Sequence, residues 1–308
     1  MPVQRPMTFT QLEIFALVAE LRGFTSAAMQ LSISQSAVSH AVRSLERELG
    51  VELIERQQGG IEVTGIGRQL LGRSREILGL AESMRQEATD SVGLKQGSLR
   101  IASFGPTSSL KLLPAILDTY RRRYPGIEVR VDEGADHEAV QWIHDRSVDV
   151  GFVVLPQERF DTVPLLEDQL VALVSAGHPL AGRRGLALAE LGDSPFIMTA
   201  AGCAPLIEPL FAGARVVPKV RYRISQVMTI LGMVERGDGL AIVAELALPE
   251  RLAQQYPGLV KIPLKPVARR HIGLAVRDLR QVTPATRAFL DVARKLAPAL
   301  RRGTAFAG

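Results

Sequence analysis

Two short helices joined by a tight corner, predicted over residues 24–49, constrain the fold of this chain more than any other stretch. In the first helix, Ala27 and Ala28 are small enough for two steeply crossing helices to approach closely. The second helix has a suitable N-cap in Ser34 and carries a narrow apolar stripe that must pack against neighbouring helices. The stripe consists of Ala37, Val38, Ala41, Val42, Leu45 and Leu49.

The opposite face of the second helix is polar. Residues three or four apart project together from a helix, so this face presents one continuous set of side chains. Short Ser and Gln side chains let a helix enter the major groove and hydrogen-bond with base edges, while Arg binds guanine or holds a phosphate. The alternative is a helical hairpin whose polar face is only solvated. The predicted DNA contacts are Ser34, Gln35, Ser36, Ser39, His40 and Arg43, with Arg47 on the same face.

The complete run resembles the helix-turn-helix signature of the LysR-type transcriptional regulators. The resemblance implies a sequence-specific regulator that binds double-stranded promoter DNA and responds to a small-molecule effector. It also implies a β-wing after residue 50, in which Arg56 is the candidate phosphate contact and Ile54 stands where the family usually has Phe. The matching residues are Phe24-Thr25, Ala27-Ala28, Leu31, Ser34-Gln35, Ala37-Val38-Ser39, Leu45-Glu46, Leu49-Gly50, Leu53, Arg56, Val63-Thr64 and Gly67.

Further elements complete a predicted DNA-binding domain over residues 1–64. Residues 8–21 have helical periodicity with Thr8 or Thr10 as a cap, and residues 53–64 form a hairpin around Gly59-Gly60. A helix follows, with apolar residues seven apart, in a linker over residues 65–92. Its thin apolar seam needs a partner, either another copy in a homodimer or homotetramer, as the resemblance implies, or another part of the same chain.

A hinge at residues 92–98 separates this part from a second kind of sequence, in which strand-like and helix-like runs alternate to the end of the chain. Such alternation predicts a parallel sheet covered by helices. The fold class is therefore α/β, with a mainly α-helical winged helix-turn-helix and a linker helix ahead of an effector domain over residues 93–308. That domain resembles a two-lobed periplasmic-binding-protein fold, with lobe 1 at about 98–165 and 268–302 and lobe 2 at about 166–267.

The effector site is expected where strands end. In doubly wound sheets ligands bind beyond the carboxyl ends of strands, near helix N-termini. Hydroxyl and amide groups there suit a carboxylate or another small anion, although each one alone is also a plausible helix cap. Glu133 and Asp136 lie nearby and favour a cationic group instead, so the charge of the effector stays open. The candidates are Ser103, Phe104, Thr107, Ser108, Thr199, Ser225 and Gln226.

Composition argues against a membrane protein and a secreted protein. With 46% hydrophobic and 22% charged residues, and without an apolar run near the roughly 18 residues of a membrane span, the chain is expected to be globular and cytoplasmic, with no membrane association and no secretory signal. Residues 1–63 carry five Arg and no Lys against seven Glu and no Asp, so the net charge of +5 does not itself support DNA binding. The single cysteine, Cys203, is either a buried inert thiol or a redox sensor.

Catalytic and cofactor motifs are missing, so no enzyme activity, metal or cofactor is expected. The five histidines are scattered, and Gln141 stands where a zinc-protease string beginning at His137 needs its second ligand. Ser108 and Lys111 match a Ser-x-x-Lys spacing without its companion motifs. A DNA-bending protein would leave residues beyond 90 without a role. The remaining alternative is a cytosolic solute sensor whose helix-turn-helix makes non-specific DNA or protein contacts.

Overall fold

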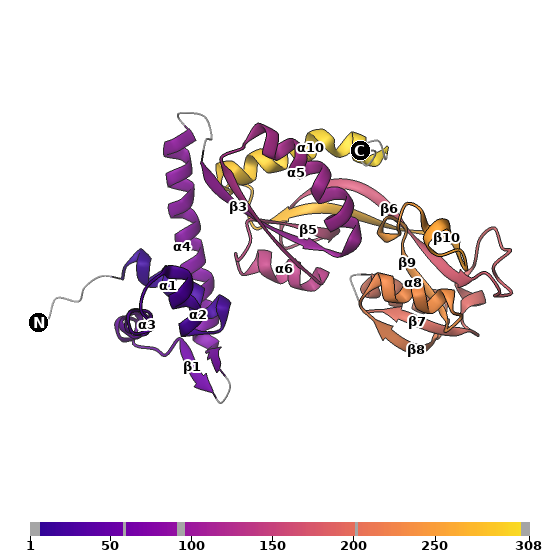
Figure 1. The fold of residues 1–308 in the computed structure, drawn as a ribbon, viewed down its shortest axis with the longest axis horizontal. Coiled ribbons are helices and arrows are strands. Elements are labelled where there is room, and N and C mark those ends of the chain that lie inside the picture. The colour runs from indigo at the N-terminus through magenta and orange to yellow at the C-terminus, as the bar shows by residue number, and fades with distance from the viewer. Residues whose placement is uncertain (1–6, 58–59, 91–95, 201–202, 303–308) are drawn as a thin grey trace, which may run out of the picture. The chain divides into compact units, whose positions relative to one another are not determined.

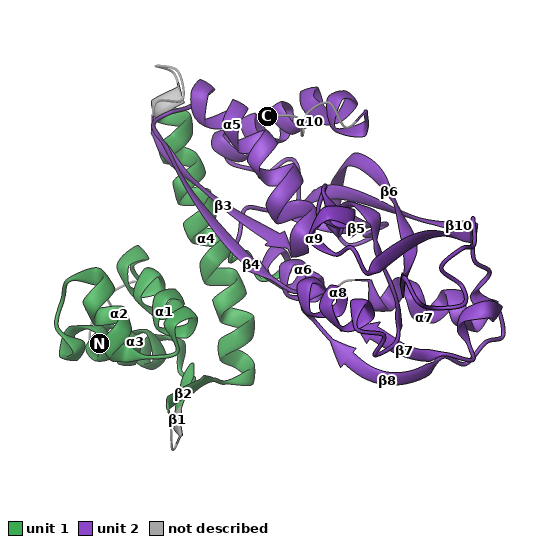
Figure 2. Cartoon of the chain, turned by 45° about the vertical axis from the view of Figure 1, so that its right-hand side comes forward, with its two compact units in different colours: residues 1–93, 144–147 green, residues 94–143, 148–308 purple. Residues whose placement is uncertain are grey.

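The computed structural model of the chain describes residues 7–57, 60–90, 96–200 and 203–302. The expected N-terminal tail, Gly59 and most of the expected hinge lie outside these ranges. Two compact units make up the chain: residues 1–93 with 144–147, and residues 94–143 with 148–308 (Figure 2).

Three helices open the first unit: α1 (Phe9–Leu21), α2 (Phe24–Leu31) and α3 (Gln35–Leu49) (Figure 1). The Thr8 side chain accepts a hydrogen bond from the backbone N–H of Gln11, and Ser34 Oγ accepts one from the N–H of Ala37 at 3.2 Å. Both side chains satisfy N–H groups that a helix start leaves free, so the sequence defines where α1 and α3 begin.

The apolar stripe of α3 is narrower than predicted. Val38, Val42 and Leu45 are buried against α1 and α2, whereas Ala37 and Leu49 are exposed. Ala27 of α2 is fully buried, in agreement with the close crossing expected from its size. Residues of the stripe divide between two small clusters, one around α2 and the other around Phe15 of α1 and Leu53.

A hairpin and a long helix complete the first unit. Strands β1 (Ile54–Gln57) and β2 (Gly60–Val63) pair antiparallel, and α4 spans Gly65–Asp90. The carboxylate of Glu46 in α3 accepts hydrogen bonds from the N–H groups of Leu53 and Ile54 at 2.9 and 3.2 Å. The hairpin is thus tied directly to α3, and Ile54, which stands where the family usually has Phe, packs against both clusters.

Gly67→Ala is expected to destabilise the first unit by about 1–3 kcal/mol, because overpacking forces the backbone to shift. A Cβ on Gly67 would lie 2.2 Å from the carbonyl oxygen of Leu53. The control is Gly72→Ala in the same helix, where nothing lies within 4 Å and the change should stabilise by about 0.5–1 kcal/mol. Urea unfolding of the full chain, followed by hydrogen exchange in α1–α4, measures both changes. Equal stability of the two variants would contradict the clash.

The second unit is built on one eight-stranded sheet of order β4-β3-β5-β10-β6-β9-β7-β8. Two strands of 15 and 18 residues, β6 and β10, run side by side through the whole unit and pair antiparallel (Figure 1). The prediction of a parallel sheet holds for only part of it: β3 pairs parallel with β4 and β5, and β7 with β8 and β9, whereas β10 is antiparallel to both β5 and β6, so the sheet is mixed. The strands are β3 (Gly97–Phe104), β4 (Ile127–Gly134), β5 (Val150–Leu155), β6 (Asp161–Ser175), β7 (Pro195–Thr199), β8 (Lys219–Ile224), β9 (Leu240–Ala244) and β10 (Leu259–Val276).

Helices cover both faces of the sheet in each lobe. In lobe 1, α5 and α10 bury one core and α6 another; in lobe 2, α7 and α8 lie over separate cores. The chain crosses between the lobes along β6 and β10. The helical elements are η1 (Thr107–Leu112), α5 (Leu113–Arg123), α6 (Asp136–His144), η2 (Leu188–Leu191), α7 (Ala204–Gly213), α8 (Val227–Glu235), η3 (Glu245–Ala247), α9 (Leu252–Gln255) and α10 (Pro284–Arg301).

Three elements differ from the sequence-based expectation. The sequence pattern predicts a helix over residues 114–123, but the helical segment begins earlier, as the π-helical turn η1, in which the N–H of Leu113 donates to the carbonyl of Ser108. Pro114 has no N–H to donate to the preceding turn, which disfavours regular α-helical bonding there. The sequence pattern predicts no helix over α7, and it predicts strands over residues 170–174 and 271–276, whereas β6 and β10 begin well before them, at Asp161 and Leu259. Among the described residues, no helix is both long and apolar enough for a bilayer span.

Candidate functional site

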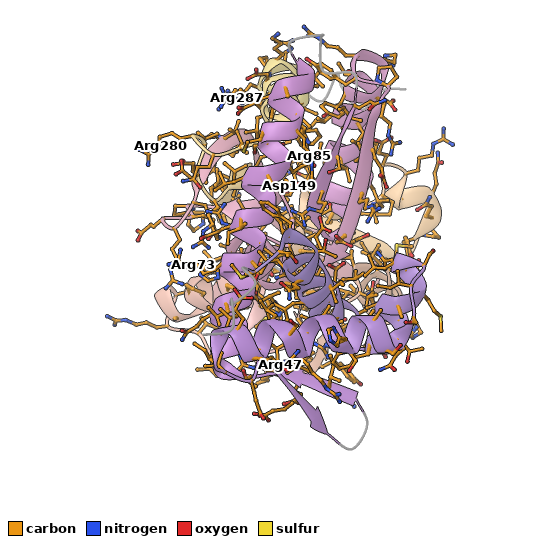
Figure 3. All side chains as sticks on the ribbon, turned by 90° about the vertical axis from the view of Figure 1, so that its left-hand side faces the viewer. Arg47, Arg73, Arg85, Asp149, Arg280 and Arg287 are labelled. Atoms are coloured by element: carbon orange, nitrogen blue, oxygen red, sulfur yellow. The ribbon has the colours of Figure 1, made fainter. Side chains whose placement is uncertain are left out.

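The predicted DNA-contacting face of α3 is exposed at most of its positions. Gln35, Ser36, His40 and Arg43 are exposed, and with Glu46 and the turn after the helix they line a shallow hollow of about 1010 Å³. The guanidinium of Arg43 has no hydrogen-bond or ion-pair partner within the described ranges. Arg47, one turn later on the same helix, donates from Nε to the carbonyl of Arg43 at 3.3 Å (Figure 3).

Ser39 and Ser34 differ from the other predicted contacts. Ser39 was expected on the exposed face but is only 8% exposed, because it follows buried Val38 and lies three residues before buried Val42. Ser34 remains exposed, but its hydroxyl is engaged as the N-cap of α3 and lies 2.9 Å from the hydroxyl of Ser36. Arg56 belongs to β1, opposite Ile61, and its side chain lies outside the described part of the chain.

The lobe 1 candidates for the effector site lie together at the end of β3 and in η1, and three of the four form one hydrogen-bonded group. Ser103 Oγ lies 3.1 Å from Ser108 Oγ and 2.9 Å from Ser109 Oγ, and Ser108 Oγ accepts from the N–H of Phe104 at 3.0 Å and donates to its carbonyl. Ser103, Phe104, Thr107 and Ser108 are all buried. The end of β3 and the π-helical turn η1 therefore hold these hydroxyls in fixed positions.

The lobe 2 candidates lie at neighbouring strand ends, as predicted, but only one of them is buried. Thr199, the last residue of β7, is 3% exposed and lies opposite Ile224, the last residue of β8. Ser225 and Gln226 follow directly and are exposed. Gln226 is the N-cap residue of α8 without a side-chain capping bond, so its amide does not cap that helix.

A buried ion pair that sequence reasoning missed connects the two lobes. Arg270 of β10 faces Asp168 of β6 directly across the antiparallel register, and Oδ2 of Asp168 accepts from Nε and Nη2 of Arg270 at 2.9 and 2.7 Å. The two side chains are 3% and 1% exposed. Oδ1 of Asp168 accepts from the N–H groups of Gln169 and Leu246, so all its acceptor positions are used within the protein.

Arg270 also contacts one predicted effector residue of lobe 1 and the single cysteine at the start of α7. Its Nη2 donates to Thr107 Oγ1 of lobe 1 at 2.7 Å, and its Nη1 lies 3.5 Å from Sγ of Cys203 at the start of α7 in lobe 2. Burial raises the pKa of the Cys203 thiol, although the Arg270 charge acts in the opposite direction. A thiol held protonated is a weak nucleophile, which favours the inert role for Cys203.

A sequence signal for this pair was present in the alternation of β10. Residues two apart share one face of a strand, and Arg270 occupies the face of buried Ala268, Ile272 and Leu274. Asp168 stands in the same relation to Leu166 and Leu170 in β6. A charge at a position where the alternation requires an apolar residue indicates a buried partner.

Within the described residues, no three His, Cys, Asp or Glu side chains are grouped so that they could hold an ion. The structure thus gathers most of the predicted DNA contacts on the exposed face of α3, and it places Thr107, one of the predicted effector residues, against the guanidinium of Arg270, which was not predicted.

Comparison with known proteins covers both units. Residues 9–68 match the bacterial regulatory helix-turn-helix family of LysR proteins, and residues 93–298 match the LysR substrate binding domain. A relative from Synechococcus elongatus, the probable HTH-type transcriptional regulator LrrA, is 38% identical over 302 residues, covering 96% of this chain and 99% of LrrA.

Two solved structures share the fold. A full-length OxyR variant from Pseudomonas aeruginosa has a TM-score of 0.72 at 22% identity, covering 94% of this chain and 98% of OxyR. The regulatory domain of CcmR from Synechocystis PCC6803, solved with 2-PG, has a TM-score of 0.61 at 24% identity and covers 67% of this chain and 100% of that domain. The relatives are transcriptional regulators and not enzymes, in agreement with the sequence-based expectation. With family matches over both its helix-turn-helix and its effector domain, the chain belongs to the LysR family of transcriptional regulators.

Proposed function

We propose that α3 reads operator sequence in the major groove through Gln35, Ser36, His40 and Arg43, with Ser34 capping the start of the helix, Ser39 at the buried edge of the reading face and Arg56 holding a phosphate. The observation that carries this proposal is the exposed Arg43 guanidinium, which has no internal partner among the described residues and can donate to a guanine edge. The hydrogen bonds that the Glu46 carboxylate accepts from the N–H groups of Leu53 and Ile54 support a fixed relation between the reading helix and the wing.

For the effector we propose a site formed by Ser103, Phe104, Thr107 and Ser108 of lobe 1 with Thr199, Ser225 and Gln226 of lobe 2. Buried hydroxyls beside a guanidinium suit a carboxylate or another small anion, which is the first class to screen. Glu133 and Asp136 at the nearby strand and helix ends favour a cationic group, so amines form the second class. A ligand changes DNA binding only if it binds one arrangement of the protein better than another.

The functional protein is proposed to be a homodimer or homotetramer that acts on DNA in the cytoplasm. Ile77, Leu80 and Met84 lie exposed along α4, and Met84 is 71% exposed, an apolar surface that a second copy would cover. The two edges of the sheet also differ in charge. Edge strand β4 carries three acidic residues and one arginine, Arg130, which pairs with Glu128, whereas β8 carries Lys219, Arg221 and Arg223. Opposite charges on the two edges favour pairing between copies.

The same proposal assigns a role to each segment. Residues 1–64 would bind DNA, residues 65–92 would dimerise, and residues 93–308 would bind effector. Lobe 1 would comprise about 98–165 and 268–302, and lobe 2 about 166–267. The long strands β6 and β10 would then transmit a change between the lobes, because both run through each of them.

Arg43→Ala is expected to weaken operator binding by about 1–3 kcal/mol if Arg43 reads a base. The test is a footprint of the full-length protein on DNA flanking its own gene, at matched salt. Arg73→Ala is the control, since Arg73 is an exposed α4 arginine with a surface ion pair to Glu76 (Figure 3).

Protection of two half-sites, lost in Arg43→Ala and kept in Arg73→Ala, would support sequence-specific regulation. An equal loss on operator and random DNA would make Arg43 a phosphate contact. Binding of all DNA alike by the wild type would instead favour the alternative function, a solute sensor with non-specific contacts.

A further inference from the structure

A second hollow lies where the two lobes of the effector domain meet, apart from the proposed effector residues. Its volume of about 570 Å³ lies within the usual range for small-molecule sites, roughly 300–1,000 Å³. Lys111 of η1 contributes from lobe 1. The other lining residues belong to lobe 2, from the segment that follows β9 and from the start of β10. A molecule in this hollow would contact both lobes.

The floor of the hollow is apolar and continuous with the cores of both lobes. Leu246 packs against the lobe 1 core that α5 and α10 cover. Leu248 and Leu259 are buried members of the lobe 2 core under α8. All three line the hollow, so an apolar group placed there would rest on side chains whose positions depend on how the two lobes pack.

The rim of the hollow carries more positive than negative charge. Lys111, Arg251 and Lys261 are basic, whereas Glu245 and Glu250 are acidic. Burial acts to raise the pKa of Glu245, but hydrogen bonds from Lys261 and Gln169 and the nearby Lys111 charge lower it overall, so Glu245 is ionised and already satisfied. Within the described ranges, Lys111 and Arg251 have neither a hydrogen bond nor an ion pair from their side chains. Two cations therefore remain available beside an apolar floor.

A chain of hydrogen bonds connects this hollow to the proposed effector residues. The N–H of Leu246 donates to Oδ1 of Asp168 at 3.1 Å, Asp168 is paired with Arg270, and Arg270 donates to Thr107 at 2.7 Å. Thr107 and Lys111 also belong to the same π-helical turn, η1. A shift of Leu246 or of η1 on ligand binding would thus act on groups that the proposed effector site uses.

We propose that this hollow is a second ligand site, for amphipathic carboxylates, and that its occupation alters the response to the effector. The carboxylate lies against Lys111 and Arg251, and the apolar part covers Leu246, Leu248 and Leu259. The regulatory part of this inference rests on the proposed function; the binding part does not. Since the site includes residues of both lobes, its ligand has different affinities for different lobe arrangements, and by linkage the two sites influence each other.

The test measures binding of 3-phenylpropionate and 4-methylpentanoate to the full-length protein by calorimetry and by the thermal unfolding midpoint. The neutral amides of both acids are the chemical controls. Both carboxylates are expected to bind, with Lys111→Gln weakening them about tenfold or more, since it removes a charged donor. The control is Lys295→Gln. Lys295 is an exposed lysine of α10, a helix that contributes no residue to the lining of the hollow, so this variant is expected to bind both carboxylates as the wild type does.

Three results would overturn the binding site: no binding of either carboxylate, equal binding of the amides, or unchanged binding by Lys111→Gln. The regulatory role is tested separately, by repeating the operator footprint with and without 3-phenylpropionate in the presence of an identified effector. An unchanged effector response while the carboxylate is bound would overturn that role. If the wild type protects no DNA at all, the proposed function fails, while the calorimetry still decides whether the site exists.

Discussion

Arg270→Met is expected to lower the unfolding free energy of the second unit by about 3–5 kcal/mol, because removing one partner of a buried ion pair leaves the other charge uncompensated. The side chains of Arg270 and Asp168 are 3% and 1% exposed, so water cannot replace the lost cation. Thr107 Oγ1 also loses its donor in this variant. Both effects act at the junction of the two lobes.

The chain offers a matched control one residue away. Arg269 of β10 pairs with Glu167 of β6 on the opposite face of the same two strands, with side chains 59% and 43% exposed. Arg269→Met should cost no more than about 1 kcal/mol, as exposed ion pairs do. A difference of several kcal/mol between the two variants would isolate the effect of burial from the effect of charge.

Urea denaturation of the full-length protein, followed by fluorescence, measures both variants. The single tryptophan, Trp142, lies in α6 of the second unit and reports on its unfolding. In the double variant Arg270→Met with Asp168→Leu, no buried charge is left alone, so much of the stability should return. Similar midpoints for Arg270→Met and Arg269→Met would contradict the assignment of Arg270 as the buried connection between the lobes.

Leu45→Ala is expected to destabilise the first unit by about 2–5 kcal/mol, the cost of deleting a buried leucine side chain and leaving a cavity. Leu45 has no exposed surface and packs with Leu12 and Phe15 of α1 and with Leu53 next to the wing. The loss therefore weakens the packing of α3 against both α1 and Leu53. Operator affinity should fall as well, at temperatures where the first unit begins to open.

Leu49→Ala is the control for this prediction, since Leu49 lies one turn later on α3 and is 38% exposed. It should change stability by much less, because a side chain that already contacts water loses less on truncation. Hydrogen exchange of the full-length protein, read from peptides within α1–α3, measures the opening free energy of this unit alone. Equal protection in Leu45→Ala and Leu49→Ala would contradict the packing of α3 through Leu45 against α1.

The DNA-binding half was predictable because its signals are local. Caps such as Thr8 and Ser34 act within three residues of their own position, and the apolar stripe of α3 follows the period of one helix. Even there, Ser39 was placed on the wrong side of the boundary between exposed and buried residues. Successive residues of a helix are about 100° apart around its axis, and how far neighbouring helices cover its flank depends on their packing.

For the effector domain, the sequence predicted the fold class but not the strand directions or the strand boundaries. Alternating strand and helix signals indicated an α/β domain, and strand ends indicated where Ser103, Thr107 and Thr199 would lie. The direction of β10 and the early starts of β6 and β10 were not predicted. Their first parts contain Pro164, Pro263 and Pro266 and charged side chains among the apolar ones, so the sequence pattern of a strand is weak there, and only pairing with the neighbouring strands extends them.

The amino-acid sequence alone determined the two kinds of unit, the reading helix and its caps, because these depend on interactions within a few residues. Only the tertiary structure decided the pairing of Arg270 with Asp168, which lie 102 residues apart. It also decided that Lys111 lines one hollow together with the segment after β9, and that Thr107 and Cys203 both contact the guanidinium of Arg270. The physical reason is that a charged side chain requires a partner only when it is buried. Which strands bury a residue is set by the register of the whole sheet.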